Sequence, residues 1–234
     1  MHNILDLTVA RTERPAERLS FAARRMFNAG WVGQDKKALQ HHIDELAKLG
    51  VPPPKHVPTL FALGNHLLTT ADSIQVHGND TSGEVEYVLL WHQGEILVGV
   101  GSDHTDRKLE THSIPKAKNL CLNVMATTVW PYTEVKDHFE QLMLESHVVR
   151  DGSRQLYQKD ACGKILGPAY WIDFLTRQLK GMEDGLVLFS GTIGTVSGLL
   201  TGEAYDFSLS DPVLEREISH RYACPALTGA LEDY

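Results

Sequence analysis

Residues 84–103, EVEYVLLWHQGEILVGVGSD, contain two apolar runs on either side of a short polar segment. This pattern predicts a β-hairpin with Gln93 and Gly94 as its two-residue turn, because glycine readily adopts the positive φ that such turns need. In this register His92 pairs with Glu95. Because side chains alternate along a strand, one face of the hairpin is predicted to be entirely apolar and to pack into the core.

Three acidic residues fall at the open end of this hairpin. The same register places Glu84 opposite Asp103 and Glu86 opposite Gly101, and side chains that oppose each other share a face of the sheet. We therefore expect the three carboxylates to converge, with empty space beside them at Gly99 and Gly101. Such a cluster suits a hard divalent cation, Mg²⁺ or Mn²⁺, which prefers oxygen ligands. The alternative is a solvated acidic strand end without an ion.

The rest of the sequence predicts an α+β protein in which strands dominate. The clearest helix spans residues 35–50, with Asp35 as its N-cap and Gly50 at its C-terminal end. Further helices are predicted over residues 168–179 and 135–142. Most of the remaining chain consists of short apolar runs separated by Gly, Asn and Asp, which is typical of strands and turns.

The chain divides at a proline-rich segment, residues 51–58, VPPPKHVP. This segment predicts a linker between a small N-terminal α/β lobe, residues 1–58, and a main domain, residues 59–234. Within the lobe, residues 18–34 predict one or two short strands with a turn at 28–30.

Composition excludes several classes of function. The 234 residues carry a net charge of −8 without a basic run, so we expect no nucleic-acid partner. The apolar runs are too short to span a bilayer, and the first twenty residues lack the apolar segment of a signal peptide. The cysteines are few and show no metal-binding spacing, which predicts reduced thiols in a cytoplasmic protein. They are Cys121, Cys162 and Cys224.

Four motifs, in order along the chain, resemble the fumarylacetoacetate hydrolase superfamily. The segment Glu84-Val85-Glu86 resembles its Glu-x-Glu strand, and DHTDR, residues 103–107, resembles its Asp-x-x-x-Arg segment. Lys118 in AKNLCLNVMATTVWP is similar to the lysine that follows, and the Gly-Thr pair in EDGLVLFSGTIGTV is similar to the C-terminal motif. As a whole, the chain resembles a divergent, uncharacterised bacterial branch of that superfamily.

This resemblance implies a fumarylacetoacetate hydrolase-like β-roll that holds Mg²⁺ or Mn²⁺ on Glu84, Glu86 and Asp103, in a homodimer. It implies a small carboxylate substrate, a 2-oxo or 1,3-diketo acid, whose C–C bond is hydrolysed. A hydratase or a 2-oxo-acid decarboxylase on the same scaffold is an alternative reading, as is a binding protein that keeps the fold without catalysis. A cupin-like metal site would instead require histidine ligands.

The resemblance also implies roles for residues around the ion. Lys118 would donate a hydrogen bond to an enolate or metal-bound oxygen, although Lys116 competes for this role. Arg107 would bind a substrate carboxylate, unless it merely forms a surface ion pair with the neighbouring aspartate. Thr192 and Gly191 would bind the other end of the substrate.

A hydrolase or hydratase also needs a general base that activates water. His66 and His77 are candidates, because both lie close in sequence to the Glu-x-Glu strand. His104 follows Asp103 directly and should face away from the ion. Cys121 is interpreted as a small buried apolar residue and not as a nucleophile.

Overall fold

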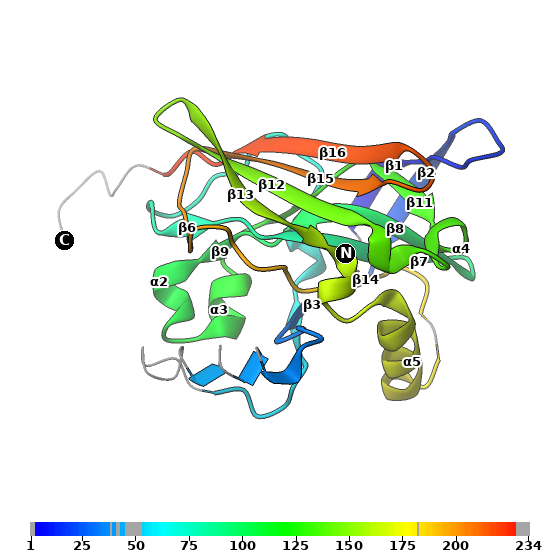
Figure 1. The fold of residues 1–234 in the computed structure, drawn as a ribbon, viewed down its shortest axis with the longest axis horizontal. Helices are drawn as coiled ribbons and strands as arrows, with labels where there is room; N and C mark the ends of the chain where they lie inside the picture. Colours follow the sequence, from blue (N-terminus) through cyan, green and yellow to red (C-terminus); the bar gives the residue numbers. More distant parts are fainter. Residues whose placement is uncertain (1–2, 38, 41–42, 45–52, 182, 228–234) are drawn as a thin grey trace.

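The computed structural model describes residues 3–37, 39–40, 43–44, 53–181 and 183–227. Two β-sheets, of ten and of four strands, form the centre of this part of the chain, and the helices lie around them (Figure 1). The strands outweigh the helices, which confirms the predicted α+β architecture dominated by β structure. None of the described helices is long and apolar enough to cross a membrane.

The predicted hairpin forms with the predicted register. It consists of β7 (Val85–His92) and β8 (Glu95–Ser102), and both turn residues between them have positive φ, 50° and 81°. Glu86 opposes Gly101, and beyond the last ladder pair Glu84 and Asp103 exchange two backbone hydrogen bonds of 3.1 and 3.0 Å. The tight turn thus sets the pairing along the whole hairpin.

The hairpin lies in the middle of the ten-stranded sheet. The strand order is β2-β1-β11-β8-β7-β14-β3-β4, and β10 pairs with β8 and with β5. The other strands of this sheet are β1 (Asn3–Val9), β2 (Glu17–Ala23), β3 (Arg25–Gly30), β4 (Thr59–Leu63), β5 (Leu68–Thr69), β10 (Asn123–Met125), β11 (Thr128–Pro131) and β14 (Leu186–Phe189).

The two ends of this sheet approach each other, so that it curls into a roll. Asn3 on β1 donates hydrogen bonds to the carbonyl oxygens of Asn65 and Leu68, which follow β4 at the opposite edge. Apolar side chains from both ends also share one core, which includes Leu5 and Leu63. This core lies on one face of the hairpin.

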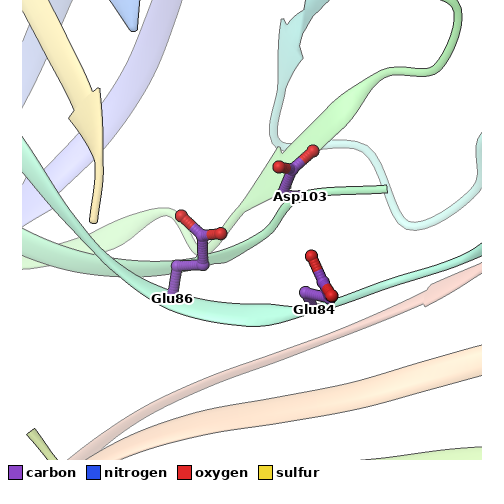
Figure 2. Close-up of side chains that lie close together, drawn as sticks. All are labelled: Glu84, Glu86 and Asp103. Carbon is purple, nitrogen blue, oxygen red and sulfur yellow. The ribbon is translucent and has the colours of Figure 1, made fainter. Parts of the chain in front are cut away.

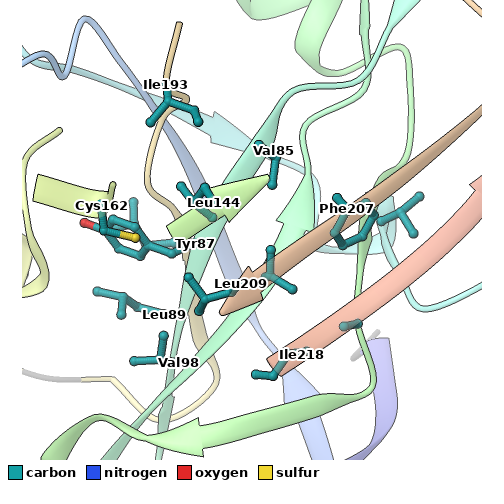
Figure 3. Close-up of a cluster of buried hydrophobic side chains, with 14 of the residues drawn as sticks. Val85, Tyr87, Leu89, Val98, Leu144, Cys162, Ile193, Phe207, Leu209 and Ile218 are labelled. Carbon is teal, nitrogen blue, oxygen red and sulfur yellow. The ribbon is translucent and has the colours of Figure 1, made fainter. Parts of the chain in front are cut away.

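The other face of the hairpin packs against the four-stranded sheet β13-β12-β15-β16. Figure 3 shows the core between them, with Tyr87 and Val98 from the hairpin near Leu209 and Ile218. The strands of the smaller sheet are β12 (Met143–Arg150), β13 (Ser153–Ala161), β15 (Ala204–Asp211) and β16 (Arg216–Ala223). A two-stranded ladder, β6 (Thr81–Ser82) with β9 (Thr105–Asp106), lies beside the open end of the hairpin.

The predicted N-terminal lobe, residues 1–58, is joined to the rest of the protein through the ten-stranded sheet. Its strand β3 pairs with β14 on one side and with β4 on the other. The predicted turn at residues 28–30 is wrong, because these residues belong to β3; the chain leaves regular strand structure at Arg24 instead.

Asp35 caps the first predicted helix as expected, accepting a hydrogen bond of 2.9 Å from the backbone of Lys37. The described residues 36–37, 39–40 and 43–44 are helical, and the predicted end at Gly50 lies outside the described residues.

The helix predicted over residues 168–179 is confirmed as α5 (Pro168–Leu179). The single helix predicted over residues 135–142 is wrong, because the chain there forms α4 (Tyr132–Val135) and then a separate 3-10 turn. Two further short helices, α2 and α3, lie below the open end of the hairpin in Figure 1. The short elements are α2 (Arg107–Glu110), α3 (Ile114–Lys118), η1 (Asn65–Leu67), η2 (Phe139–Gln141) and η3 (Cys162–Lys164).

Candidate metal centre

The three predicted acidic residues come together at the open end of the hairpin. Each of Glu84, Glu86 and Asp103 offers a carboxylate oxygen, and these atoms all lie within 4.8 Å of one another. Figure 2 shows the Glu86 and Asp103 carboxylates close together at the end of the hairpin, with Glu84 beside them. Glu86 and Asp103 are buried and Glu84 is partly exposed. Among the described residues this is the one cluster of His, Cys, Asp and Glu side chains with such geometry.

The predicted empty space beside the carboxylates is not present at the two glycines. A Cβ atom at Gly101 would lie 2.6 Å from the ring of Phe189 and 2.8 Å from the carbonyl oxygen of Val124. At Gly99 it would lie 3.2 Å from the side chain of Val129. These glycines therefore allow neighbouring groups to pack closely under the acidic cluster, and they do not leave a cavity.

Glu86 is held by the loop that follows β14. The backbone N–H of Gly191 donates a hydrogen bond of 2.8 Å to Glu86 Oε2. Gly191 has a φ of 81°, and a Cβ there would lie 2.6 Å from Val32, so another residue would be strained and would clash. Burial, and next the charge of Asp103, raise the pKa of Glu86 well above its usual value.

Asp103 is paired with Lys118, whose Nζ donates a hydrogen bond to Asp103 Oδ2. Both side chains are buried. Burial alone would raise the pKa of Asp103, but the charge and hydrogen bond of Lys118 outweigh it, so that this pKa is lowered. Burial likewise opposes the charge of Lys118, yet the surrounding carboxylates raise its pKa overall. Lys116, the competing candidate, is exposed.

Glu84 is held by Arg107, the first residue of α2. The guanidinium lies 3.2 Å from Glu84 Oε1 and 2.9 Å from Glu110 Oε2, and it donates a hydrogen bond of 2.6 Å to the hydroxyl of Ser82. The alternative of a surface ion pair with Asp106 is wrong, because Asp106 instead caps α2 by accepting from a backbone N–H at 2.7 Å. Burial raises the pKa of Glu84, although Arg107 opposes this effect.

Gln158 on β13, which the sequence analysis missed, joins Thr192 to the start of β7. The Thr192 hydroxyl donates to the carbonyl oxygen of Val85 at 2.8 Å and accepts from Gln158 Nε2 at 2.7 Å. Gln158 Oε1 in turn accepts from the backbone N–H of Val85 at 2.9 Å. A single glutamine in a strand gives no sequence signal for this role, which depends on contacts across 73 residues.

The histidine candidates lie outside the acidic cluster. His66, on η1, and His77, before β6, are both exposed, and neither contributes a ligand atom to the cluster. Their role as general base stays a prediction. His104 is buried and hydrogen-bonded to Tyr222 and Thr81, and burial lowers its pKa to about 3, which keeps it neutral. The cupin-like reading finds no support in the described residues, because no histidine belongs to the cluster.

The donor set fits a hard divalent cation. All three groups are carboxylates, and Lys118 and Arg107 compensate their charge only in part. The remaining repulsion in a buried site is relieved when a carboxylate is protonated or when a cation lies between the groups. The raised pKa values of Glu84 and Glu86 reflect the first of these solutions. Mg²⁺ and Mn²⁺ favour this oxygen chemistry and retain positions for other ligands.

The fold is shared with solved structures of small-molecule enzymes at low sequence identity. Fumarylpyruvate hydrolase from Pseudomonas aeruginosa, in complex with Mn²⁺ and pyruvate, is 15% identical with a TM-score of 0.61; 95% of this chain and 97% of that chain are covered. A 2-keto-3-deoxy-D-arabinonate dehydratase, complexed with magnesium and 2,5-dioxopentanoate, is 17% identical with a TM-score of 0.62; 88% and 74% are covered.

A fumarylacetoacetate hydrolase family protein from Yersinia pestis CO92 is 18% identical with a TM-score of 0.64; 87% of this chain and 95% of that chain are covered. The protein thus has the fold of the fumarylacetoacetate hydrolase superfamily, as the motifs predicted. Residues 29–222 match the family described as "Protein of unknown function (DUF2848)", and the chain belongs to this family. No curated protein matches the sequence.

Proposed function

We propose that the protein is a divalent-metal-dependent enzyme that acts on small 2-oxo or 1,3-diketo acids and hydrolyses a C–C bond. The observation that carries this proposal is the cluster of Glu84, Glu86 and Asp103, built at the end of a hairpin with Lys118 against Asp103. The fold supports it, because similar structures hold magnesium or Mn²⁺ together with small oxo acids.

In this proposal each neighbour of the cluster has a separate task. When bound, Mg²⁺ or Mn²⁺ supplies a Lewis acid that polarises the oxygens of the oxo acid. Arg107 and the N–H of Gly191 orient Glu84 and Glu86. Lys118 keeps its proton, because the carboxylates raise its pKa, and it donates a hydrogen bond to the substrate oxygen that gains negative charge.

An acylpyruvate illustrates the proposed hydrolysis. Water adds to the carbonyl carbon remote from the carboxylate, and the bond between that carbon and C3 of the pyruvate unit breaks. The electron pair moves into the enolate of pyruvate, which takes up a proton, and the other product is a carboxylic acid. A hydratase or a decarboxylase would rely on the same stabilisation of an enolate. The residues around the cluster therefore suit all three reactions, and analysis of the products distinguishes them.

The metal centre is tested by calorimetric titration of Mg²⁺ and Mn²⁺ into metal-stripped protein. We expect binding by the wild type, loss of binding in Glu86→Gln, and retained binding in Glu217→Gln, an exposed glutamate on β16. Binding that survives in Glu86→Gln would reject the site.

A screen of acylpyruvates and oxaloacetate then follows the products. Pyruvate with a second acid indicates hydrolysis, and carbon dioxide indicates decarboxylation. If metal binds but no compound turns over, a binding protein is favoured. The homodimer, the cytoplasmic location, substrate binding by Arg107, Thr192 and Gly191, and the roles of His66 and His77 stay predictions.

A further inference from the structure

Two buried asparagine side chains have no hydrogen-bond partner. Asn28 on β3 and Asn123 on β10 are both 0% exposed, and in each the amide nitrogen and the amide oxygen are unpaired. Burying a polar group without a partner costs free energy, so such groups are rare in folded proteins. The other buried uncharged side chains with an unpaired atom in the described part of the chain are Trp91, Tyr157 and Trp171, each with a single one.

These two carboxamides lie on the sheet face that carries the metal centre, whereas Trp91, Tyr157 and Trp171 belong to the core on the opposite face. For Asn123, the register of β10 against β8 determines which face of the sheet the side chain occupies. Met125 on β10 opposes Gly101 on β8, so two residues earlier Asn123 comes opposite Asp103. Directly opposed residues share a face, with Cβ atoms about 4.5–5.5 Å apart. Extended by one pair beyond the ladder, this register places Asn123 beside Asp103 and on the same face of the sheet.

Asn28 reaches the same region from the other side of the acidic cluster. Its carboxamide lies close enough to the Asp103 carboxylate to help lower the pKa of that group in the manner of a hydrogen bond, although neither of its polar atoms makes a hydrogen bond of normal distance and angle. Its neighbour on β4 is Phe61, whose ring centroid lies 6.0 Å from Lys118 Nζ. Asn28, Lys118 and Asp103 thus surround one region.

The chemistry of a carboxamide limits what can satisfy it. Its NH₂ group donates and its oxygen accepts, whereas a carboxylate or a keto oxygen only accepts. A plain oxo acid would therefore leave the amide oxygens of Asn28 and Asn123 unpaired. A hydroxyl group both donates and accepts, so it can donate to the oxygen of one carboxamide and accept from an NH₂ group as well.

We propose that Asn28 and Asn123 bind a hydroxyl group of the substrate, so that the metal centre prefers a hydroxylated 2-oxo acid over its unsubstituted counterpart. This inference rests on the proposed function, because it places the oxo acid on Glu84, Glu86 and Asp103. A water molecule on the cation has the same donor and acceptor chemistry, and the experiment below separates the two sources.

The test compares ligand pairs that differ by one hydroxyl group. Pyruvate against 3-hydroxypyruvate, and 2-oxobutanoate against 4-hydroxy-2-oxobutanoate, are titrated calorimetrically into the full-length protein, with and without Mg²⁺. The variants are Asn28→Leu and Asn123→Leu, which keep similar size without polar atoms, with Asn28→Ala and Asn123→Ala in reserve if either fails to fold. Asn79→Leu, at an exposed position, is the matched control.

We expect the wild type and Asn79→Leu to bind one hydroxylated ligand about tenfold more tightly than its partner, since one well-made hydrogen bond can give such a factor. In Asn28→Leu and Asn123→Leu this ratio should fall toward one. Their affinity for Mg²⁺ alone should stay unchanged, and their ligand-free Tm should not decrease, because an unpaired polar group is removed.

Three results would overturn the inference. The first is that the wild type binds the hydroxylated and the unsubstituted ligand of both pairs equally well. The second is that the leucine variants keep the wild-type ratio of these two affinities. The third is that the variants lose affinity for Mg²⁺ without a change in this ratio, which would assign the carboxamides to a metal-bound water. Failure of the proposed function is read separately, as absent Mg²⁺ binding by the wild type. In that case the ratio in the metal-free arm still decides whether the carboxamides select a hydroxyl group.

Discussion

Replacing Glu86 with glutamine should stabilise the metal-free protein above neutral pH and at the same time abolish its stabilisation by Mg²⁺. Glutamine has the shape of glutamate, and its Oε1 can accept the same hydrogen bond from the Gly191 N–H. The substitution therefore changes the charge of the acidic cluster while leaving its packing intact. If Glu86 only supported the fold, Glu86→Gln would instead destabilise the metal-free protein.

The size of the effect follows from the spacing of the carboxylates. With ligand atoms within 4.8 Å of one another, each pair of full charges repels by about 3.5 kcal/mol at an effective dielectric constant of about 20. Glu86 takes part in two of the three pairs. Lys118 and protonation of Glu86 offset most of this repulsion, so we expect a net gain of about 2 kcal/mol. For a chain of this size that corresponds to roughly 4–8 °C in Tm.

The pH dependence has a defined sign. Burial, and then Asp103, raise the pKa of Glu86, so the folded protein favours its protonated form. The corresponding stability is fully present below the usual pKa of about 4.5 and is lost as the pH rises through the raised pKa. The gain in Glu86→Gln should therefore be absent near pH 5 and grow toward pH 9. Asp103, whose pKa is lowered, changes charge below this window.

The assay is thermal unfolding between pH 5 and 9, first with a chelator and then with Mg²⁺. Saturation of the wild type at 100 times its Kd should add about 2.7 kcal/mol, and Glu86→Gln should show no such increase. The reasoning is refuted if Glu86→Gln is less stable than the wild type at every pH. Equal stabilisation of both proteins by Mg²⁺ would refute it as well.

Two further substitutions test the surroundings of the cluster. Lys118→Met leaves Asp103 as a buried charge without its partner, so we expect a loss of about 3–5 kcal/mol in the metal-free protein that Mg²⁺ partly restores, measured by denaturant unfolding with and without the ion. Gly101→Ala places a Cβ 2.6 Å from the ring of Phe189 and 2.8 Å from the carbonyl of Val124, so it should cost about 1–3 kcal/mol in the same measurement. Unchanged stability in either variant would contradict the packing described above.

The hairpin and its acidic end could be predicted because their determinants are local. A two-residue turn at Gly94 fixes the register, and the alternation of strand side chains then assigns Glu86 and Asp103 to one face. The Asp103–Arg107 spacing resembled a known motif, and it placed Arg107 near the cluster. The structure adds that Arg107 binds Glu84, a pairing that the motif did not show.

The groups supplied by distant strands could not be predicted. Gln158 acts from β13, and Asn28 acts from a strand that the sequence analysis assigned to a turn, because Asn and Gly are common turn residues. Asn123 becomes a neighbour of Asp103 only through the pairing of β10 with β8. A single sequence does not specify which strands pair across such separations, so the side chains facing the cluster were known only from the fold.

The charges around the cluster explain why a divalent ion suits it. Glu84, Glu86, Asp103 and Glu110 face Lys118 and Arg107, which leaves an excess of two negative charges when all groups are ionised. One divalent cation neutralises this excess, whereas a monovalent ion would leave half of it. Without the cation the protein lowers the excess by protonating glutamates, as the raised pKa values of Glu84 and Glu86 indicate. Binding of Mg²⁺ must then release protons, and its affinity must rise with pH until both glutamates are ionised.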